Sequence, residues 1–155
     1  MDDNQTDVTI LTRAECLMLL AQASIGRIGA SMGALPVILP VHFAVHEESV
    51  LFRTIPGTKL DAATIGAVVA FQADAYEPLD GTGWSVLLQG IASEVSDEEG
   101  NALARSVPIR SWVGMESNHR LVRIGVANVS GRQFRTAGEG PAVEFPDAPR
   151  LNESP

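Results

Sequence analysis

The sequence contains little from which a disulfide framework, a zinc site or a membrane span could be built. Its single cysteine, Cys16, cannot form an internal disulfide, and no Cys/His cluster surrounds it. The apolar stretch 25–45 is interrupted by arginine, serine, glycine and two prolines, so it falls short of the roughly 20 apolar residues of a membrane helix. Residues 1–7 are acidic and polar, which is unlike a secretory signal. We therefore expect a cytoplasmic protein that does not associate with a membrane.

Basic charge is also scarce. The 155 residues carry a net formal charge of −8, and Lys59 is the only lysine. Because nucleic-acid binding needs a basic face, this balance argues against a nucleic-acid partner. Hydrophobic residues make up 45% of the chain and charged residues 19%, which is typical of a globular domain. We predict one folded domain over 9–135, between a mobile acidic segment at 1–8 and a mobile tail at 136–155.

Three short helices are predicted from capping signals. Thr12 and Glu15 have the spacing of a capping box, in which each side chain bonds to the other residue's backbone N–H. Thr58 and Asp97 each stand where a cap is needed at the start of a further short helix. The expected caps are thus Thr12, Thr58 and Asp97, and the helices are expected to end near Ser24, before Gly66 and near Arg105.

Extended segments joined by short turns occupy most of the remaining domain. The pattern predicts about seven strands, at 25–32, 35–45, 50–54, 67–73, 84–95, 120–126 and 129–135. Pro36 and Pro40 cannot donate to a strand ladder, so their strand is expected at an edge or with a bend. Without a repeating helical crossover the sheet should be largely antiparallel. The predicted fold class is mostly β, a small barrel with short flanking helices.

Four residues around one predicted strand–helix connection indicate a phosphate site. Arg53 and Thr54 end a strand, and Thr58 and Lys59 open the next helix. A guanidinium, two hydroxyls, an ammonium and free helix N–H groups could therefore converge on one anion. Arginine supplies a bidentate fork and lysine a point charge, which together suit a terminal phosphate. The alternative is a solvated strand end followed by a capped helix.

Other candidate sites are weaker. Trp84 and Ser85 follow two glycines and offer a flat apolar face and a hydroxyl to a ligand, although Trp84 could instead plug one end of the barrel. His42 and His46 share a strand face but lie about 13 Å apart, too far for one metal ion. Cys16 is expected to be a small core residue rather than a nucleophile. We predict no metal site and identify no catalytic residue.

A series of short motifs follows in an order that is typical of one known family. They are Leu11-Thr12 with Glu15, Gly26-Arg27-Ile28-Gly29, Leu39-Pro40-Val41, Leu51-Phe52-Arg53-Thr54, Gly57-Thr58-Lys59-Leu60, Val69-Ala70-Phe71-Gln72, Gly83-Trp84-Ser85-Val86 and Val129-Ser130-Gly131-Arg132. Together they resemble the pyridoxamine 5′-phosphate oxidase-like flavin-binding split barrels, especially small actinobacterial members. The resemblance covers roughly residues 9–135 and is specific through the order and spacing of the motifs. It implies an antiparallel split barrel that forms a dimer.

The resemblance also implies a cofactor and its contacts. It implies a homodimer with a flavin, expected to be FMN, in each of two grooves at the subunit interface. Arg53, Thr54 and Lys59 match the positions that hold the FMN phosphate. Pro40 and Val41 match positions whose backbone lies near the isoalloxazine ring. Trp84 and Ser85 match positions on the strand that joins the interface. Thr58, the expected helix cap, completes the set of expected cofactor-binding residues. The flavin would carry the redox chemistry, and the protein would position it.

The implied function is that of an FMN-binding oxidoreductase acting on an unidentified small organic substrate. Pyridoxamine phosphate oxidases themselves carry a C-terminal substrate motif with arginine and histidine, and 136–155 contains no histidine, which argues against vitamin B6 oxidation. Two alternatives stay open. One is a deazaflavin-dependent reductase on the same barrel, with Arg120, Arg123 or Arg132 holding a longer anionic tail. The other is a non-catalytic protein that binds or senses a flavin.

Overall fold

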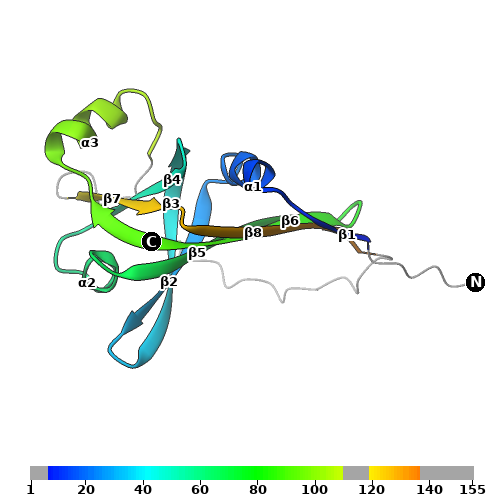
Figure 1. Ribbon diagram of the computed structural model, residues 1–155, viewed down its shortest axis with the longest axis horizontal. Coiled ribbons are helices and arrows are strands. Elements are labelled where there is room, and N and C mark those ends of the chain that lie inside the picture. Colours follow the sequence, from blue (N-terminus) through cyan, green and yellow to red (C-terminus); the bar gives the residue numbers. More distant parts are fainter. Residues whose placement is uncertain (1–6, 110–118, 137–155) are drawn as a thin grey trace, which may run out of the picture.

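The computed structural model describes residues 7–109 and 119–136, which form an antiparallel barrel with a lateral extension (Figure 1). Within these ranges the chain forms β1 (Asp7–Ile10), α1 (Arg13–Leu20), β2 (Ile25–Met32), β3 (Leu35–His46), β4 (Ser49–Thr54), α2 (Lys59–Thr64), β5 (Val68–Glu77), β6 (Thr82–Glu94), α3 (Asp97–Ala104), β7 (Arg120–Gly125) and β8 (Asn128–Arg135). None of the helices in the described ranges has the length and apolarity needed to cross a membrane. The predicted mostly-β fold with short flanking helices is confirmed.

Six of the strands close a barrel. Their order in space is β1-β8-β6-β5-β2-β3-β4-β7, and β6 also pairs with β7, so the strands from β6 round to β7 form a ring. All of these pairings are antiparallel. β8 and β1 continue the sheet outward from β6, and Figure 1 shows them extending away from the barrel. This architecture is the antiparallel split barrel that the motifs imply.

The long strand β6 belongs to both parts of the fold. Residues 82–89 pair with β8, whereas residues 92–94 pair with β7 and close the barrel. Gly90 lies between these two stretches, and a Cβ added there would lie 1.7 Å from the carbonyl oxygen of Gly125. Only a residue without a side chain allows the two backbones to approach this closely. Gly90 therefore marks the point at which β6 changes partner.

The prolines of β3 lie where the sequence predicts. Residues 35–42 pair with β2, and β4 pairs with β3 only from Phe43 onward within the described part of the chain. Pro36 and Pro40 therefore lie in the half of β3 that has an open edge, where a missing N–H leaves no ladder bond unmade. The open edge that the prolines predict is present along residues 35–42, whereas β4 covers that edge of the strand from Phe43 to His46.

One strand lies outside the seven that were predicted. β1 begins at Asp7, two residues before the expected start of the domain, and pairs with β8 from Asp7 opposite Arg135 to Ile10 opposite Arg132. Four residues are too few for a strand pattern, and their partner is at the other end of the chain. Residues 1–6 and 137–155, which make up most of the two segments expected to be mobile, lie outside the described ranges.

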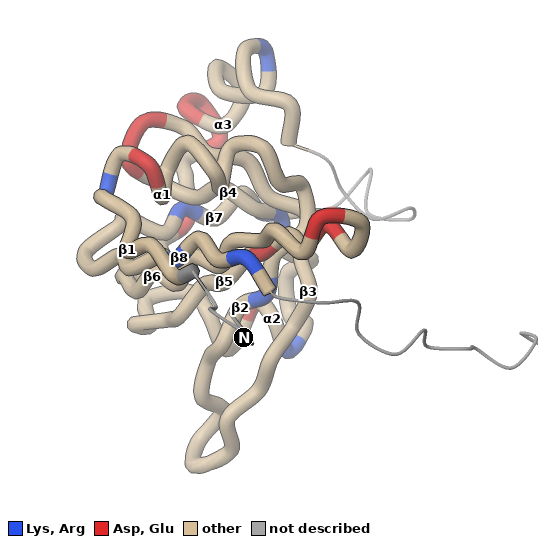
Figure 2. Tube along the Cα trace, turned by 90° about the vertical axis from the view of Figure 1, so that its right-hand side faces the viewer, with Lys and Arg blue, Asp and Glu red and all other residues tan. Residues whose placement is uncertain are grey.

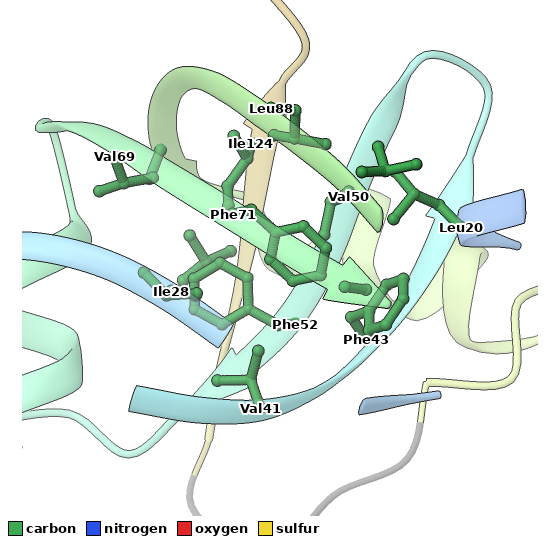
Figure 3. Packing of buried hydrophobic residues seen from close by; sticks show 14 of the residues in the cluster. Leu20, Ile28, Val41, Phe43, Val50, Phe52, Val69, Phe71, Leu88 and Ile124 are labelled. Carbon is green, nitrogen blue, oxygen red and sulfur yellow. The ribbon is translucent and has the colours of Figure 1, made fainter. Parts of the chain in front are cut away.

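The barrel interior is packed with aromatic and branched side chains (Figure 3). Phe43 and Phe71 meet edge to face with ring centroids 4.7 Å apart, and Val41 and Phe52 point into the same core. A second, smaller core lies on the other side of β4, where α3 and the residues after it cover Leu51. Because successive strand residues point to opposite faces, β4 contributes to both cores.

The helices begin largely as predicted. Thr12 and Glu15 form both halves of the capping box, and Thr58 caps α2. The prediction that Asp97 caps the third helix is wrong by one residue: the side chain of Ser96 accepts from the Glu99 backbone N–H, and Asp97 is the first helical residue. Serine and aspartate are equally good caps. Where the two stand side by side, the sequence does not determine which of them is the cap, and the predicted start of the helix can be wrong by one residue. The first helix also ends earlier than expected, at Leu20.

Candidate functional site

A buried carboxylate holds the connection between β4 and α2. The Thr54 hydroxyl donates to Asp61 Oδ1 at 2.9 Å, and the Gly57 backbone N–H donates to Asp61 Oδ2 at 3.0 Å. Arg120 of β7 places its Nε 3.6 Å from Oδ1. Asp61 is only 8% exposed, so these three partners satisfy a charge that would otherwise be costly to bury. Residues 54–57 are thereby tied to the helix that follows them.

Asp61 is not among the site residues expected from the sequence. A signal was present, because Thr58 and Asp61 have capping-box spacing, and Thr58 Oγ1 does accept from the Asp61 backbone N–H at 3.4 Å. The Asp61 side chain, however, bonds to Thr54 and Gly57, and its third partner, Arg120, is distant in the sequence. Those contacts follow from the tertiary fold and not from local spacing.

Arg53 and Thr54 point to opposite faces of β4. Thr54 is fully buried on the barrel side, where its hydroxyl is taken by Asp61, while Arg53 lies on the α3 side with Leu51. Alternation along a strand makes this unavoidable for adjacent residues. The expected convergence of the Arg53 guanidinium and the Thr54 hydroxyl on one anion therefore does not occur. The Thr54 side chain instead fixes the loop through Asp61.

Arg53 lines a cavity of about 400 Å³ between β4, β7 and the first turns of α3. Its Nε is buried and has no hydrogen-bond partner among the described residues. Another nitrogen of its guanidinium contacts Nε2 of His119, and burial lowers the pKa of the guanidinium from its ordinary value. A buried N–H without an acceptor is costly, and an anionic ligand would satisfy it.

Charges of both signs meet at this cavity. Arg53, His119 and Arg120 contribute basic groups to its lining, and Glu94 and Asp97 contribute carboxylates. Arg120 lies between two acids, with its Nε 3.5 Å from Glu94 Oε1 as well as 3.6 Å from Asp61. Its charge is therefore largely neutralised inside the protein. Arg53 is the basic group of the cavity that retains an unused donor.

Thr58 and Lys59 lie outside the described lining of this cavity, to which their loop contributes Pro56. The Thr58 hydroxyl donates to the Ile55 carbonyl oxygen at 2.8 Å and accepts from the helix, so it is fully used within the loop. Lys59 is exposed and forms no ion pair with any described residue. Of the four residues expected to hold phosphate, Arg53 and Lys59 therefore have side chains available to a ligand.

Pro40 and Val41 lie on β3, opposite Arg27 and Gly26 of β2. Pro40 is exposed, while the Val41 side chain is buried in the barrel core (Figure 3). A ligand outside the barrel could therefore meet Val41 only through its backbone.

Trp84 and Ser85 lie in the part of β6 that pairs with β5 and β8, whereas Arg53 lies on β4 between β3 and β7. Trp84 belongs to the main core and lines a small cavity of about 280 Å³ beside Tyr76. Ser85 Oγ accepts from Gln72 Nε2 at 3.4 Å on the outer face of the sheet. Within one subunit these residues do not join the Arg53 cavity.

The remaining chemically active side chains have structural surroundings. Cys16 is fully buried, and a Cβ added at Gly131 would lie 2.6 Å from its sulfur, which confirms its expected place in the core. His42 Nδ1 lies 3.3 Å from the Ser24 carbonyl oxygen. Across residues 7–109 and 119–136, no group of three or more histidine, cysteine or acidic side chains could hold a metal ion.

The outer face of β2, β3, β5 and β6 carries many exposed apolar side chains. They include Ile25, Ile38, Val68, Leu87 and Ile91, with Ile38 and Val68 74% and 73% exposed. We call this surface the outer sheet face. The β2–β3 hairpin projects from the body of the protein and carries no lysine, arginine or acidic residue over 28–46 (Figure 2). Exposed apolar surface of this extent is typical of a protein interface.

A polar group lies within this apolar surface. Arg27 Nη1 donates to Gln72 Oε1 at 3.1 Å and lies 3.8 Å from an Asp74 carboxylate oxygen. Gln72 Nε2 donates to Asp74 at 2.7 Å and to Ser85 at 3.4 Å. These four side chains come from three strands and satisfy one another at the surface of one subunit.

Comparison with known proteins identifies the family. The model of the family described as pyridoxamine 5′-phosphate oxidase matches residues 12–133. The chain belongs to this family. The predicted resemblance is therefore confirmed over almost the range that the motifs covered. Among curated members, an uncharacterized protein of Mycobacterium tuberculosis, Rv0080, is 39% identical over 114 residues, which are 70% of this chain and 74% of that protein.

Solved structures similar to this family member have the same fold. The FAD binding protein from Mycobacterium smegmatis is 37% identical, with a TM-score of 0.73 over 82% of this chain and 98% of that one. A putative pyridoxamine 5′-phosphate oxidase from Corynebacterium glutamicum is 30% identical, with a TM-score of 0.75 over 90% of this chain and 99% of that one. Both likenesses span the whole barrel.

Proposed function

We propose that this protein binds FMN and uses it as an oxidoreductase acting on a small organic substrate. The observation that carries the proposal is its likeness to the M. smegmatis protein named for FAD binding, which extends over 98% of that chain at 37% identity. FMN and FAD share the riboflavin 5′-phosphate, so one anchor for that phosphate would serve either cofactor. When bound, the flavin would supply the electron-transfer chemistry, and the residues of this chain would bind and orient it.

Arg53 and Lys59 are the proposed phosphate anchor. Within the described part of the chain, the buried Nε–H of Arg53 has no acceptor and Lys59 forms no ion pair, so both side chains can bind an anion. They stand at the two ends of residues 54–58, the loop tied down by Asp61. Glu94 and Asp97 also line the Arg53 cavity, so an anion bound to Arg53 would have two carboxylates nearby.

We also propose that the flavin site is completed by a second copy of the chain. The outer sheet face is apolar and exposed, and burying it against an identical face would remove that surface from water. Trp84 and Ser85 lie on β6, which forms part of this sheet, but they do not reach the Arg53 cavity of their own subunit. In a homodimer they would contribute to the site of the partner, and the backbone at Pro40 and Val41 would face the ring.

The test is a titration of the purified protein with FMN, FAD and a deazaflavin cofactor, followed by visible absorption. Arg53→Ala and Lys59→Ala should each weaken FMN binding about 10-fold to 150-fold, because charge-assisted hydrogen bonds contribute about 1.5–3 kcal/mol. Arg105→Ala is the matched control, since it removes the same charge from an exposed position directly after α3 that is not part of the described cavity lining. Unchanged FMN affinity in both anchor variants would contradict the assignment.

The same titration separates the alternative functions. Selective binding of the deazaflavin would favour the reductase that uses that cofactor, and tighter binding of FAD would correct the choice of flavin. FMN binding without turnover by reduced nicotinamide and an electron acceptor would favour a flavin-binding or sensing protein.

A further inference from the structure

We propose that Asp61 is a positioning residue that holds the β4–α2 loop in the geometry required for phosphate binding. This inference rests on the proposed function and extends it to a residue that does not itself touch the ligand. Its basis is a buried carboxylate whose partners come from β4, from the loop and from β7. No other described acidic side chain of this molecule is both buried and bonded to this loop.

The first argument is geometric. Asp61 accepts hydrogen bonds from Thr54 and Gly57, which lie between the two proposed anchors, Arg53 and Lys59. Gly57 has a φ of +83°, a conformation that favours glycine, and it directs its N–H to the carboxylate. Fixing the loop before the ligand arrives reduces the entropy that binding must otherwise remove. The arginine and lysine are thereby kept at a constant separation.

The second argument concerns Arg120. Its Nε lies 3.6 Å from Asp61 and 3.5 Å from Glu94, so the two acids hold it at the boundary between the loop and the Arg53 cavity. Asp61→Asn removes the charge that faces Arg120 and replaces one acceptor oxygen by an NH2 group. The loop would then lose its ionic contact with β7 and one of its two hydrogen bonds to residue 61. Asp61 therefore couples the loop to the cavity wall.

The sign of the expected effect distinguishes positioning from simple electrostatics. A carboxylate near a phosphate site repels the ligand, so by charge alone its removal should strengthen FMN binding. A positioning role predicts the opposite: Asp61→Asn should weaken FMN binding, even though the negative charge has been removed. Thr54→Val should act in the same direction, because it deletes one bond to Asp61 and leaves every charge in place.

The experiment compares FMN with riboflavin, which lacks the phosphate, on the full chain. Wild-type protein should bind FMN more tightly than riboflavin. In Asp61→Asn and Thr54→Val the Kd for FMN should rise about tenfold, the change expected when one charge-assisted contact is lost, while the Kd for riboflavin stays within twofold. A purely structural defect would weaken both ligands together. Glu99→Gln is the matched control, since it makes the same acid-to-amide change at a carboxylate that pairs with Arg123 of β7 and is not part of the described lining of the Arg53 cavity.

The outcomes are separable. The measured quantity is the ratio of FMN affinity to riboflavin affinity. If this ratio in Asp61→Asn equals or exceeds that of the wild type, the positioning role is overturned and the proposed function stays intact. Parallel weakening of both ligands in Asp61→Asn and Thr54→Val also overturns it. A wild-type protein that binds neither flavin overturns the proposed function, and the inference with it. A fall in the ratio of FMN affinity to riboflavin affinity in both variants, with the ratio of Glu99→Gln equal to that of the wild type, supports the role.

Discussion

Arg53 and Thr54 are adjacent in the sequence, yet their side chains lie on opposite faces of β4 and have different partners. Thr54 faces the barrel and bonds to Asp61, while Arg53 faces the cavity beside α3 and keeps a buried donor that finds no acceptor among the described residues. The motif could indicate which residue types a phosphate site needs, but strand alternation decides which of them can reach one ligand. The sequence therefore indicated the strand–helix connection at which the candidate site lies, but not which of its side chains face a ligand.

Cys16 gives a prediction at the same scale. Its thiol is fully buried, and burial, with a smaller contribution from Glu15, raises the pKa of the thiol above its ordinary value. Because the thiolate is the reactive form, the native protein should react with a thiol reagent at pH 8 much more slowly than the protein in urea. The measurement is the rate of labelling with and without denaturant. Equal rates would show that α1 does not pack against β8 as described.

At the level of elements, the local signals were the reliable ones. The caps at Thr12 and Thr58 and the prolines of β3 act within a few residues, and the structure places them as the sequence predicts. The shift from Asp97 to Ser96 at α3 arose where two good caps stand side by side. β1 was missed because its pairing with β8 is not encoded locally.

Gly90 should be the most sensitive glycine of the strands. Gly90→Ala places a methyl group 1.7 Å from the Gly125 carbonyl oxygen, so β6 or β7 must move. The free energy of unfolding should fall by about 1–3 kcal/mol or more, the cost of forcing extra atoms into a packed site. Urea denaturation followed by circular dichroism measures it. Gly125→Ala is the control, because a Cβ there meets nothing within 4 Å, and it should have little effect.

At the level of the whole molecule, one barrel leaves many apolar side chains of its outer sheet face in water, and Trp84 and Ser85 lie outside its described Arg53 cavity. The outer sheet face surrounds the polar group of Arg27, Gln72, Asp74 and Ser85. If two such faces meet, this polar group lies inside the interface and would help to fix the alignment of the two copies. The proposed homodimer thus accounts for both the exposed surface and the distance between Trp84 and the Arg53 cavity.

Ile38→Asp tests the proposed dimer. Ile38 is 74% exposed in one subunit, so the substitution should not affect the fold of a monomer, but a charge there would oppose burial of the outer sheet face. Light scattering after size exclusion at micromolar concentration should find a wild-type dimer and a largely monomeric variant with weaker FMN binding. Leu79→Asp, at a turn position that is 95% exposed, should remain dimeric. A wild-type monomer that retains flavin would contradict a site at the interface.

The sequence by itself determined the family, the mostly-β class, seven of the eight strands and the starts of two helices. Those features depend on alternation, capping and proline, whose effects extend over only a few residues. The tertiary structure decided which strands β6 joins, which face each site residue occupies and which partners Asp61 finds. The contact between Asp61 and Arg120 shows the reason. It brings together residues from opposite halves of the domain, and only the long-range pairing of β4 with β7 places them side by side.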